Sequence, residues 1–237
     1  YTLRCDSATL SAPAADQEEI AGMDDTATTT LTADFRNTDL GNGWQPSALT
    51  ELACATKFSI DTYENGCKLL CLATGERYLV TPEGFDKAQL GQLAGDIAVI
   101  EQPVGNIYLA ATSAPCLFDA LGIVDTVGML SMQAQDCSVQ SFARALEAGT
   151  IEFGGKYNAP DYERIVNKGC KLAIESTIIN HNPEVKEKLQ DLGITVLTEL
   201  SSYEPEALGR LEWIKLYGAI FNREAEAEAV FNEQARL

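Results

Sequence analysis

The sequence predicts an α/β protein in which a parallel sheet is flanked by helices and preceded by an N-terminal β-meander. From about residue 97, short apolar segments of strand length alternate with helical segments, most of which close on a glycine. Between residues 58 and 80, apolar and polar residues alternate instead, with turn signals between the runs. A hydrophobic fraction of 46% provides enough apolar material for a buried core.

The first 50 residues differ in texture from the rest of the chain. They are rich in Ala, Thr, Asp and Ser and contain few aliphatic clusters. We expect residues 1–50 to be a polar lead-in or linker. Two interpretations remain open for it, namely a tether linked to export and a simple disordered segment.

The meander is predicted by its turns. Glu64-Asn65-Gly66 is a strong hairpin signal, Gly75 marks the next turn, and Pro82-Glu83-Gly84 ends the run. The expected strands are 58–63, 67–73 and 77–80.

The alternating region is read in the same way. Pro115 suits the first turn of a helix that Gly122 closes, and Asn182 can cap a helix that ends at Gly193. The expected strands are 97–101, 106–111, 127–131, 171–175 and 194–199. The expected helices are 116–121, 139–148, 161–167 and 183–192.

Two helices are expected at the C-terminal end, over 207–221 and 223–237, with Asn222 capping the second. We therefore expect an α/β lobe over residues 51–222, with the meander at its start, followed by a separate final helix. Ala227, Val230 and Phe231 would form an exposed apolar stripe on that helix. Such a stripe predicts a homodimer formed through the C-terminal helix.

Charge excludes one class of partner. The chain carries 35 acidic and 17 basic residues, for a net charge of −18, and no Lys/Arg cluster. An acidic surface repels phosphate backbones, so no nucleic-acid binding is expected. No apolar run approaches the roughly 20 residues that span a bilayer.

Metal and cofactor chemistry has little support. The seven cysteines show no CxxC spacing and are expected to be mostly small buried hydrophobic residues. His181 is the single histidine, which makes a histidine-based metal site improbable. We expect no metal and no cofactor.

Enzyme motifs are missing as well. The sequence has no GxSxG elbow, no GK[ST] phosphate loop and no GxGxxG. Glu163, Glu175 and Glu212 could pair as catalytic carboxylates only if the fold happened to bring them together. We expect no enzymatic activity.

Polar turns at the ends of expected strands are the best candidates for a binding site. The carboxyl ends of parallel strands line the ligand crevice of open sheets, and hydroxyl, lysine and tyrosine groups there would form a recognition rim. The alternative is ordinary turn chemistry, in which Ser and Thr are common. The candidate turns are Thr112-Ser113, Lys156-Tyr157, Ser176-Thr177 and Ser201-Ser202-Tyr203.

Residues from about 57 to 237 resemble the cluster of ABC-importer solute-binding proteins that handle iron complexes, haem and cobalamin. The resemblance is carried by four stretches. They are Ile107–Ala114 with Leu117–Gly122, Gly154–Ile165, Leu172–Thr177 and, most specific of all, Leu208-Gly209-Arg210-Leu211-Glu212-Trp213-Ile214-Lys215.

The resemblance implies an extracytoplasmic, membrane-tethered lipoprotein at the cell surface or in the periplasm. It would capture a ferric siderophore, haem or a corrinoid between two lobes joined by a long helix, and deliver it to an ABC permease. By its place in the motif, Glu163 would dock with permease arginines, although a capping or solvated glutamate explains it equally well. Arg210 would either grip an anionic ligand or pair with Glu212.

The chain departs from the family pattern in two places. Glu206-Ala207 stands where relatives often have His-Pro, and no second lobe follows residues 223–237, which would be the start of the interlobe helix. A fragment, a split receptor and a truncated gene would each explain this. A docking or scaffold protein that kept the fold but not the ligand therefore remains the alternative function, ahead of an enzyme built on the same lobe.

Overall fold

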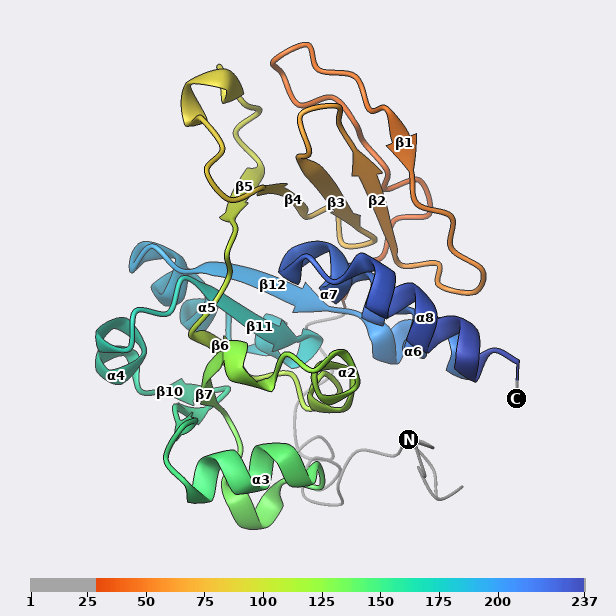
Figure 1. The fold of residues 1–237 in the computed structure, drawn as a ribbon. Coiled ribbons are helices and arrows are strands. Elements are labelled where there is room, and N and C mark those ends of the chain that lie inside the picture. The colour runs from red at the N-terminus through yellow and green to blue at the C-terminus, as the bar shows by residue number, and fades with distance from the viewer. Residues whose placement is uncertain (1–28, 237) are drawn as a thin grey trace.

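The computed structural model describes residues 29–236, which form two sheets with helices around the second one (Figure 1). The second sheet is entirely parallel and is flanked by helices, and the first lies N-terminal to it and is mainly antiparallel. This is the fold class that the sequence predicts.

The N-terminal sheet has the strand order β1-β2-β3-β4-β5. Its first four strands are antiparallel neighbours, so the predicted meander is confirmed, and Gly66 in its first hairpin turn has a φ of 82°. The fifth strand runs parallel to β4 and therefore belongs here and not to the sheet of βα units, in contrast to the strand-helix alternation expected from residue 97. The strands are β1 (Ala48–Leu49), β2 (Phe58–Thr62), β3 (Lys68–Leu72), β4 (Arg77–Thr81) and β5 (Ile97–Glu101).

The parallel sheet has the strand order β12-β11-β6-β7-β8, and every neighbouring pair in it is parallel. Its strands are β6 (Ile107–Leu109), β7 (Val127–Leu130), β8 (Glu152–Phe153), β11 (Leu172–Ser176) and β12 (Thr195–Glu199). The connecting helices are α2 (Pro115–Leu121), α3 (Gln140–Glu147), α4 (Tyr162–Asn167) and α5 (Pro183–Asp191). Pro115 stands in the first turn of α2 and Gly122 closes it with a φ of 67°, as the sequence predicts.

Several short elements complete the connections. A two-stranded hairpin follows β8, and single 3-10 turns join most of the remaining strands and helices. They are η1 (Lys87–Leu90), η2 (Val124–Thr126), η3 (Ala134–Asp136), β9 (Gly155–Lys156), β10 (Ala159–Pro160), η4 (Thr177–His181) and η5 (Ser201–Tyr203).

The C-terminal helices differ from the sequence prediction. The expected helix 207–221 is broken at Trp213 into α6 (Ala207–Glu212) and α7 (Ile214–Phe221). Asn222, predicted to cap the last helix at its start, instead ends α7 in the left-handed conformation, with a φ of 57°. That turn folds α8 (Glu224–Gln234) back along α7 (Figure 1).

The apolar stripe expected on the last helix is covered by the chain itself. Ala227 and Phe231 are 0% and 2% exposed, and Val230 is half-buried against the same core. Because α8 lies against α7 and α2, Ala227 and Phe231 offer no exposed surface to a second copy. The expectation of an exposed stripe is therefore wrong, and the homodimer that was inferred from it stays a prediction.

One helix lies at the centre of the main core. Residues 214 to 220 of α7 are all buried. The core they share takes Phe58 and Leu70 from the first sheet and Leu109 and Ile174 from the second. A second core lies on the opposite face of the parallel sheet, under α4 and α5, and a third covers the outer face of the N-terminal sheet.

Part of the predicted lead-in packs on the first sheet. Leu40 is 1% exposed within the third core, and Arg36 forms an ion pair with the fully buried Asp61 of β2. Residues 1–28 lie outside the described residues. That they belong to a polar lead-in or linker therefore stays a prediction.

The expectation that the cysteines are mostly buried is met by some of them. Among residues 29–236 the six cysteines are all free thiols, and Cys67, Cys71 and Cys170 are buried. Cys67 and Cys71 share one face of the sheet, as expected. Cys5 lies outside the described residues. No helix within residues 29–236 is both long enough and apolar enough to cross a membrane.

Candidate functional site

The strand order of the parallel sheet reverses between β6 and β11. From β6 the chain moves outward through β7 to β8, and it then returns to the other side of β6 to form β11 and β12. The helices on the two sides of this reversal lie on different faces of the sheet. Helix α2 packs in the main core, whereas α4 and α5 pack in the core on the opposite face. Such a reversal opens a crevice at the carboxyl ends of the two strands that flank it.

The turn after β6 contributes Thr112 and Ser113 to this edge. Thr112 is exposed, and Ser113 is half-buried and donates its hydroxyl to Oε2 of Glu199 over 2.7 Å. Glu199 ends β12 and is 1% exposed, and its Oε1 accepts the backbone N–H of Ser201 over 2.9 Å. Burial raises the pKa of Glu199, and the hydrogen bonds from Ser113 and Ser201 oppose that rise. Glu199 therefore joins the turns after β6 and β12 across the end of β11.

Ser176 and Thr177 lie between these two turns, at the end of β11, and both are half-buried. The residue before them, Glu175, was expected from the sequence only as a carboxylate that the fold might bring near another. Glu175 is 1% exposed, and its Oε1 has no hydrogen-bond partner among the described residues. Burial raises the pKa of Glu175 to about 8.

Lys156 and Tyr157 come from the β9–β10 hairpin that follows β8. Lys156 is exposed and Tyr157 is half-buried against the second core. The hairpin depends on Gly155, which has a φ of 84° and whose added Cβ would lie 2.5 Å from the carbonyl oxygen of Ala159. The Gly155 carbonyl accepts the hydroxyl of Tyr108 over 3.1 Å, which fixes the hairpin to β6.

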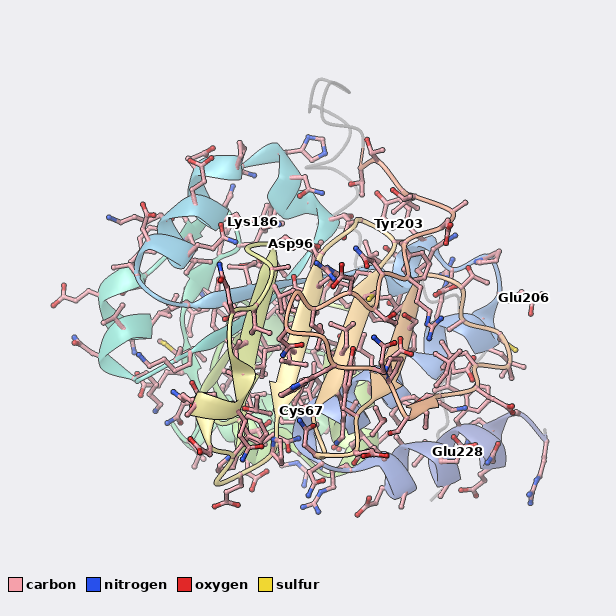
Figure 2. The ribbon with its side chains drawn as sticks, turned by 90° about the horizontal axis from the view of Figure 1, so that it is seen from above. Cys67, Asp96, Lys186, Tyr203, Glu206 and Glu228 are labelled. Atoms are coloured by element: carbon pink, nitrogen blue, oxygen red, sulfur yellow. The ribbon has the colours of Figure 1, made fainter. Side chains whose placement is uncertain are left out.

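Ser202 and Tyr203 lie in η5, the turn after β12, and both are exposed. In the view from above, Tyr203 and Glu206 lie on one side of the N-terminal sheet and Lys186 of α5 on the other (Figure 2). Arg210 follows on α6 and is half-buried, with its Nε donating to the carbonyl of Glu204 over 3.5 Å.

The expected pairing of Arg210 with Glu212 is replaced by other contacts. Glu212 is fully buried, accepts Nζ of Lys215 over 2.9 Å, and accepts the backbone N–H groups of residues 53, 54 and 55. This carboxylate therefore fastens the segment before β2 to α6.

Glu163 lies in the first turn of α4 and is exposed. The side chain of the preceding Asp161 accepts the N–H of Arg164 and so caps the helix. Capping is thus carried by Asp161, which leaves the carboxylate of Glu163 on the surface and sterically accessible to a partner.

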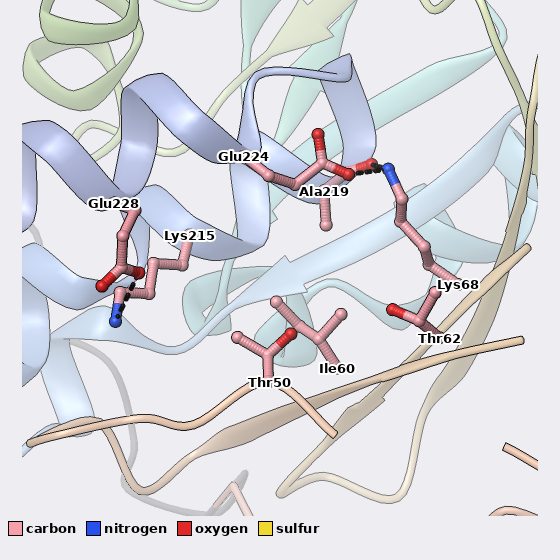
Figure 3. A pocket seen from close by; sticks show the side chains of 8 residues that line it. All are labelled: Thr50, Ile60, Thr62, Lys68, Lys215, Ala219, Glu224 and Glu228. Carbon is pink, nitrogen blue, oxygen red and sulfur yellow. Dashed lines mark hydrogen bonds and ion pairs between the residues drawn. The ribbon is translucent and has the colours of Figure 1, made fainter. Parts of the chain in front are cut away.

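Two hollows lie away from the switch point. An open groove of about 360 Å³ runs beside β8, lined among others by Gln133, Phe153 and Arg164. A cavity of about 80 Å³ lies between the N-terminal sheet and α7 and α8 (Figure 3). In it Lys68 pairs with Glu224 and Lys215 pairs with Glu228, so its charged groups neutralise one another. No cluster of His, Cys, Asp and Glu suited to a metal occurs among residues 29–236.

Comparisons with known proteins give a faint but consistent likeness. No family model matches the sequence. An uncharacterized lipoprotein of Methanocaldococcus jannaschii is 23% identical over 176 residues, which are 70% of this chain and 42% of that protein. The chain thus spans about two fifths of the length of this relative.

Solved structures of binding proteins superpose on part of the chain. A petrobactin-binding protein of Bacillus subtilis superposes with a TM-score of 0.42 at 15% identity, over 55% of this chain and 43% of the other. A periplasmic heme-binding protein of Pseudomonas aeruginosa gives a TM-score of 0.42 at 16% identity, over the same shares of the two chains.

The predicted ligand contacts gather along one edge of the parallel sheet. Eight of the nine predicted ligand contacts lie in turns at the carboxyl ends of β6, β8, β11 and β12, and Arg210 lies on the helix after the last turn. They offer hydroxyl, ammonium and aromatic groups, which can orient a polar ligand through hydrogen bonds and stacking.

Proposed function

We propose that this chain is a ligand-capturing lobe of an extracytoplasmic solute-binding protein that serves an ABC importer. The observation that carries the proposal is the reversal of strand order between β6 and β11, with Thr112, Ser113, Ser176 and Thr177 at the carboxyl ends of these two strands. The sequence stretches that resemble the importer family include both of these strand ends.

The proposed cargo is an iron complex, haem or a corrinoid. Thr112 and Ser176 would hydrogen-bond polar groups of the cargo, and Lys156 and Arg210 would offset its negative charge. Tyr157 and Tyr203 would pack against its rings or its metal-binding arms. The Methanocaldococcus jannaschii relative is a lipoprotein, which supports a membrane-tethered location outside the cytoplasm for this chain.

In this proposal Glu163 docks the lobe onto the permease. Its exposure on α4, with Asp161 serving as the cap, is what a bidentate contact with an arginine requires. Substitution of Glu163 is expected to lower transport while leaving cargo binding unchanged.

A thermal-shift screen tests the cargo. The chain is heated with haem, cobalamin or a panel of ferric siderophores, with the iron-free siderophores as controls. A ligand that binds only the folded protein raises the melting temperature, because binding adds to the free energy of unfolding. A rise of about 5 °C is expected when the correct cargo is present at roughly 100 times its dissociation constant.

Matched lysine variants locate the binding. Lys156→Gln is expected to reduce the rise, whereas Lys171→Gln, at the amino end of β11 and equally exposed, is expected to leave it intact. A panel with no rise at all would exclude the lobe as an independent receptor and favour the docking or scaffold function. An equal loss in both variants would place the ligand elsewhere.

A further inference from the structure

Four glutamates are buried at or near the carboxyl edge of the parallel sheet, and one of them differs from the other three. Glu199, Glu204 and Glu212 each accept two or more hydrogen bonds. Glu175 is equally buried, yet its Oε1 has no partner among the described residues. Buried carboxyl groups without partners are costly and uncommon, so they mark candidate functional sites.

The surroundings of Glu175 are aromatic. Tyr108 of β6 pairs with Ala173, which lies two residues before Glu175 on β11 and packs in the same core. Tyr162 of α4 and Tyr157 pack against that core as well. Burial is the largest cause that raises the pKa of the Tyr108 hydroxyl, and the charge of Glu175 is the next largest. The pKa of Tyr162 is raised by burial and by the charges of Glu184 and Glu175. These tyrosines therefore lie within electrostatic range of the carboxyl group.

A carboxylate beside tyrosine rings is suited to an organic cation. The carboxylate neutralises the positive charge and accepts its N–H groups, while the ring faces attract it through their quadrupoles. No lysine or arginine among residues 29–236 bonds to Oε1 of Glu175.

The residues that follow Glu175 are partly exposed. Ser176 and Thr177 stand at the end of β11 and are only half-buried, and Tyr162, which packs in the core on the same face, is half-buried as well. On the connection from β11 to α5, the buried Nδ2 of Asn182 also has no partner among the described residues.

The geometry points to Glu175 as a binding residue for a positively charged amine, with Tyr108 and Tyr162 as its aromatic walls. The inference rests on the proposed function and narrows it to a cargo that carries an ammonium group. Glu175 accepts the N–H groups of that ammonium, and the rest of the cargo occupies the rim formed by the turns after β6, β8 and β12.

A cation panel tests the site without knowledge of the cargo. The full chain is melted with butylammonium, choline or spermidine chloride, with sodium chloride and butanol as controls. At least one cation is expected to raise the melting temperature by about 5 °C when present at roughly 100 times its dissociation constant. The rise is expected to disappear in Glu175→Gln and to persist in Glu187→Gln, which removes an exposed glutamate on α5.

Glutamine matches the shape of a protonated glutamate, so Glu175→Gln is expected to fold. Tyr162→Leu is a second variant that keeps the carboxyl but removes an aromatic wall, and it too is expected to weaken cation binding. A cation panel that raises the melting temperature in no case, or raises it equally in Glu175→Gln, would overturn the inference.

A pair of iron complexes separates this inference from the proposed function. Ferrioxamine B carries a free ammonium group and its cyclic relative ferrioxamine E does not. If ferrioxamine B binds about tenfold or more tightly than ferrioxamine E, and Glu175→Gln loses this preference, the result supports both the proposed function and the role of Glu175. Equal binding of the two complexes keeps the proposed function and overturns the role of Glu175. Binding of simple cations with no binding of either complex keeps the role of Glu175 and counts against iron complexes as cargo.

Discussion

Two buried glutamates in this protein have pKa values shifted in opposite directions, and hydrogen bonds explain the difference. Burial works to raise the pKa of Glu212, but three backbone N–H groups and Lys215 outweigh it, and the pKa is lowered overall. Glu175 is buried without any such donors, and its pKa rises to about 8. Burial and the donors around a carboxyl group act against each other, and their balance decides which form is stable at neutral pH.

The free energy of unfolding should therefore fall as the pH rises from about 4.5 to about 8. In that window the folded chain holds a proton on Glu175 that the unfolded chain has lost, so each increase in pH favours unfolding. The slope from this residue is at most about 1.4 kcal/mol per pH unit. Urea denaturation at pH 5, 6, 7 and 8 measures it.

Glu175→Gln is expected to flatten that dependence, because the amide does not titrate. A dependence of the same sign should remain from Glu199, whose pKa is also raised. Glu187→Gln, at an exposed position, is the control and should keep the full slope. An unchanged slope in Glu175→Gln would mean that the carboxyl group is ionised in the folded chain.

Elements whose boundaries depend on local chemistry could be predicted from the sequence. The Asn65-Gly66 turn and the Pro115 helix start are examples, because one residue type suits each backbone conformation. The placement of β5 beside β4 could not be predicted, since its partner is chosen by tertiary packing. The break at Trp213 was missed for the same reason, because it lets the indole N–H donate to the buried Glu204 over 3.0 Å.

The contact between α7 and α8 depends on a glycine within a helix. A Cβ on Gly218 would lie 2.8 Å from the Cβ of Ala227 and 3.1 Å from the carbonyl oxygen of Arg223. Gly218→Ala gains about 1 kcal/mol of helix propensity but forces the helices apart. We expect a net loss of about 1–3 kcal/mol in the free energy of unfolding, measured by urea denaturation.

A second substitution tests whether contact with the Ala227 side chain causes the loss of stability in Gly218→Ala. Ala227→Gly removes the methyl group that the new Cβ would strike, so the double variant is expected to be more stable than the sum of the two single losses predicts. Strict additivity of the two losses would show that the methyl contact is not what Gly218 serves.

At the scale of the whole molecule, the candidate site was partly predictable because parallel strands bring their carboxyl ends to one edge. The polar turns at those ends could be identified as soon as the strands were recognised, and Ser113 and Ser176 are examples. Glu175 could not be identified in this way. Its importance depends on the absence of a partner, and which neighbours surround a residue is decided by the folded chain and not by its own segment.

Buried polar contacts join the two sheets into one unit. Glu204 and Glu212 hold the segment before β2 through its backbone N–H groups. The hydroxyl of Tyr78 on β4 donates to the carbonyl of Val196 on β12 over 2.7 Å. Since the main core also takes side chains from both sheets, the two should unfold together.

The two tryptophans can report on this coupling. Trp44 packs against Tyr63 and Phe85 on the outer face of the N-terminal sheet, and Trp213 is buried in the main core against Phe58. We expect a single urea midpoint for both, with the Trp44 signal obtained as the difference between the wild-type chain and Trp44→Phe. Glu212→Gln should lower the free energy of unfolding by about 3 kcal/mol, because the amide nitrogen cannot accept the buried donors that one carboxylate oxygen accepts, and Lys215 loses a negative partner. Both midpoints should move together in that variant, and the exposed Glu206→Gln should move neither. If Trp44 instead reported an earlier transition than Trp213, the N-terminal sheet would be a separate folding unit, and the anchoring by Glu204, Glu212 and Tyr78 would be too weak to couple it to the parallel sheet.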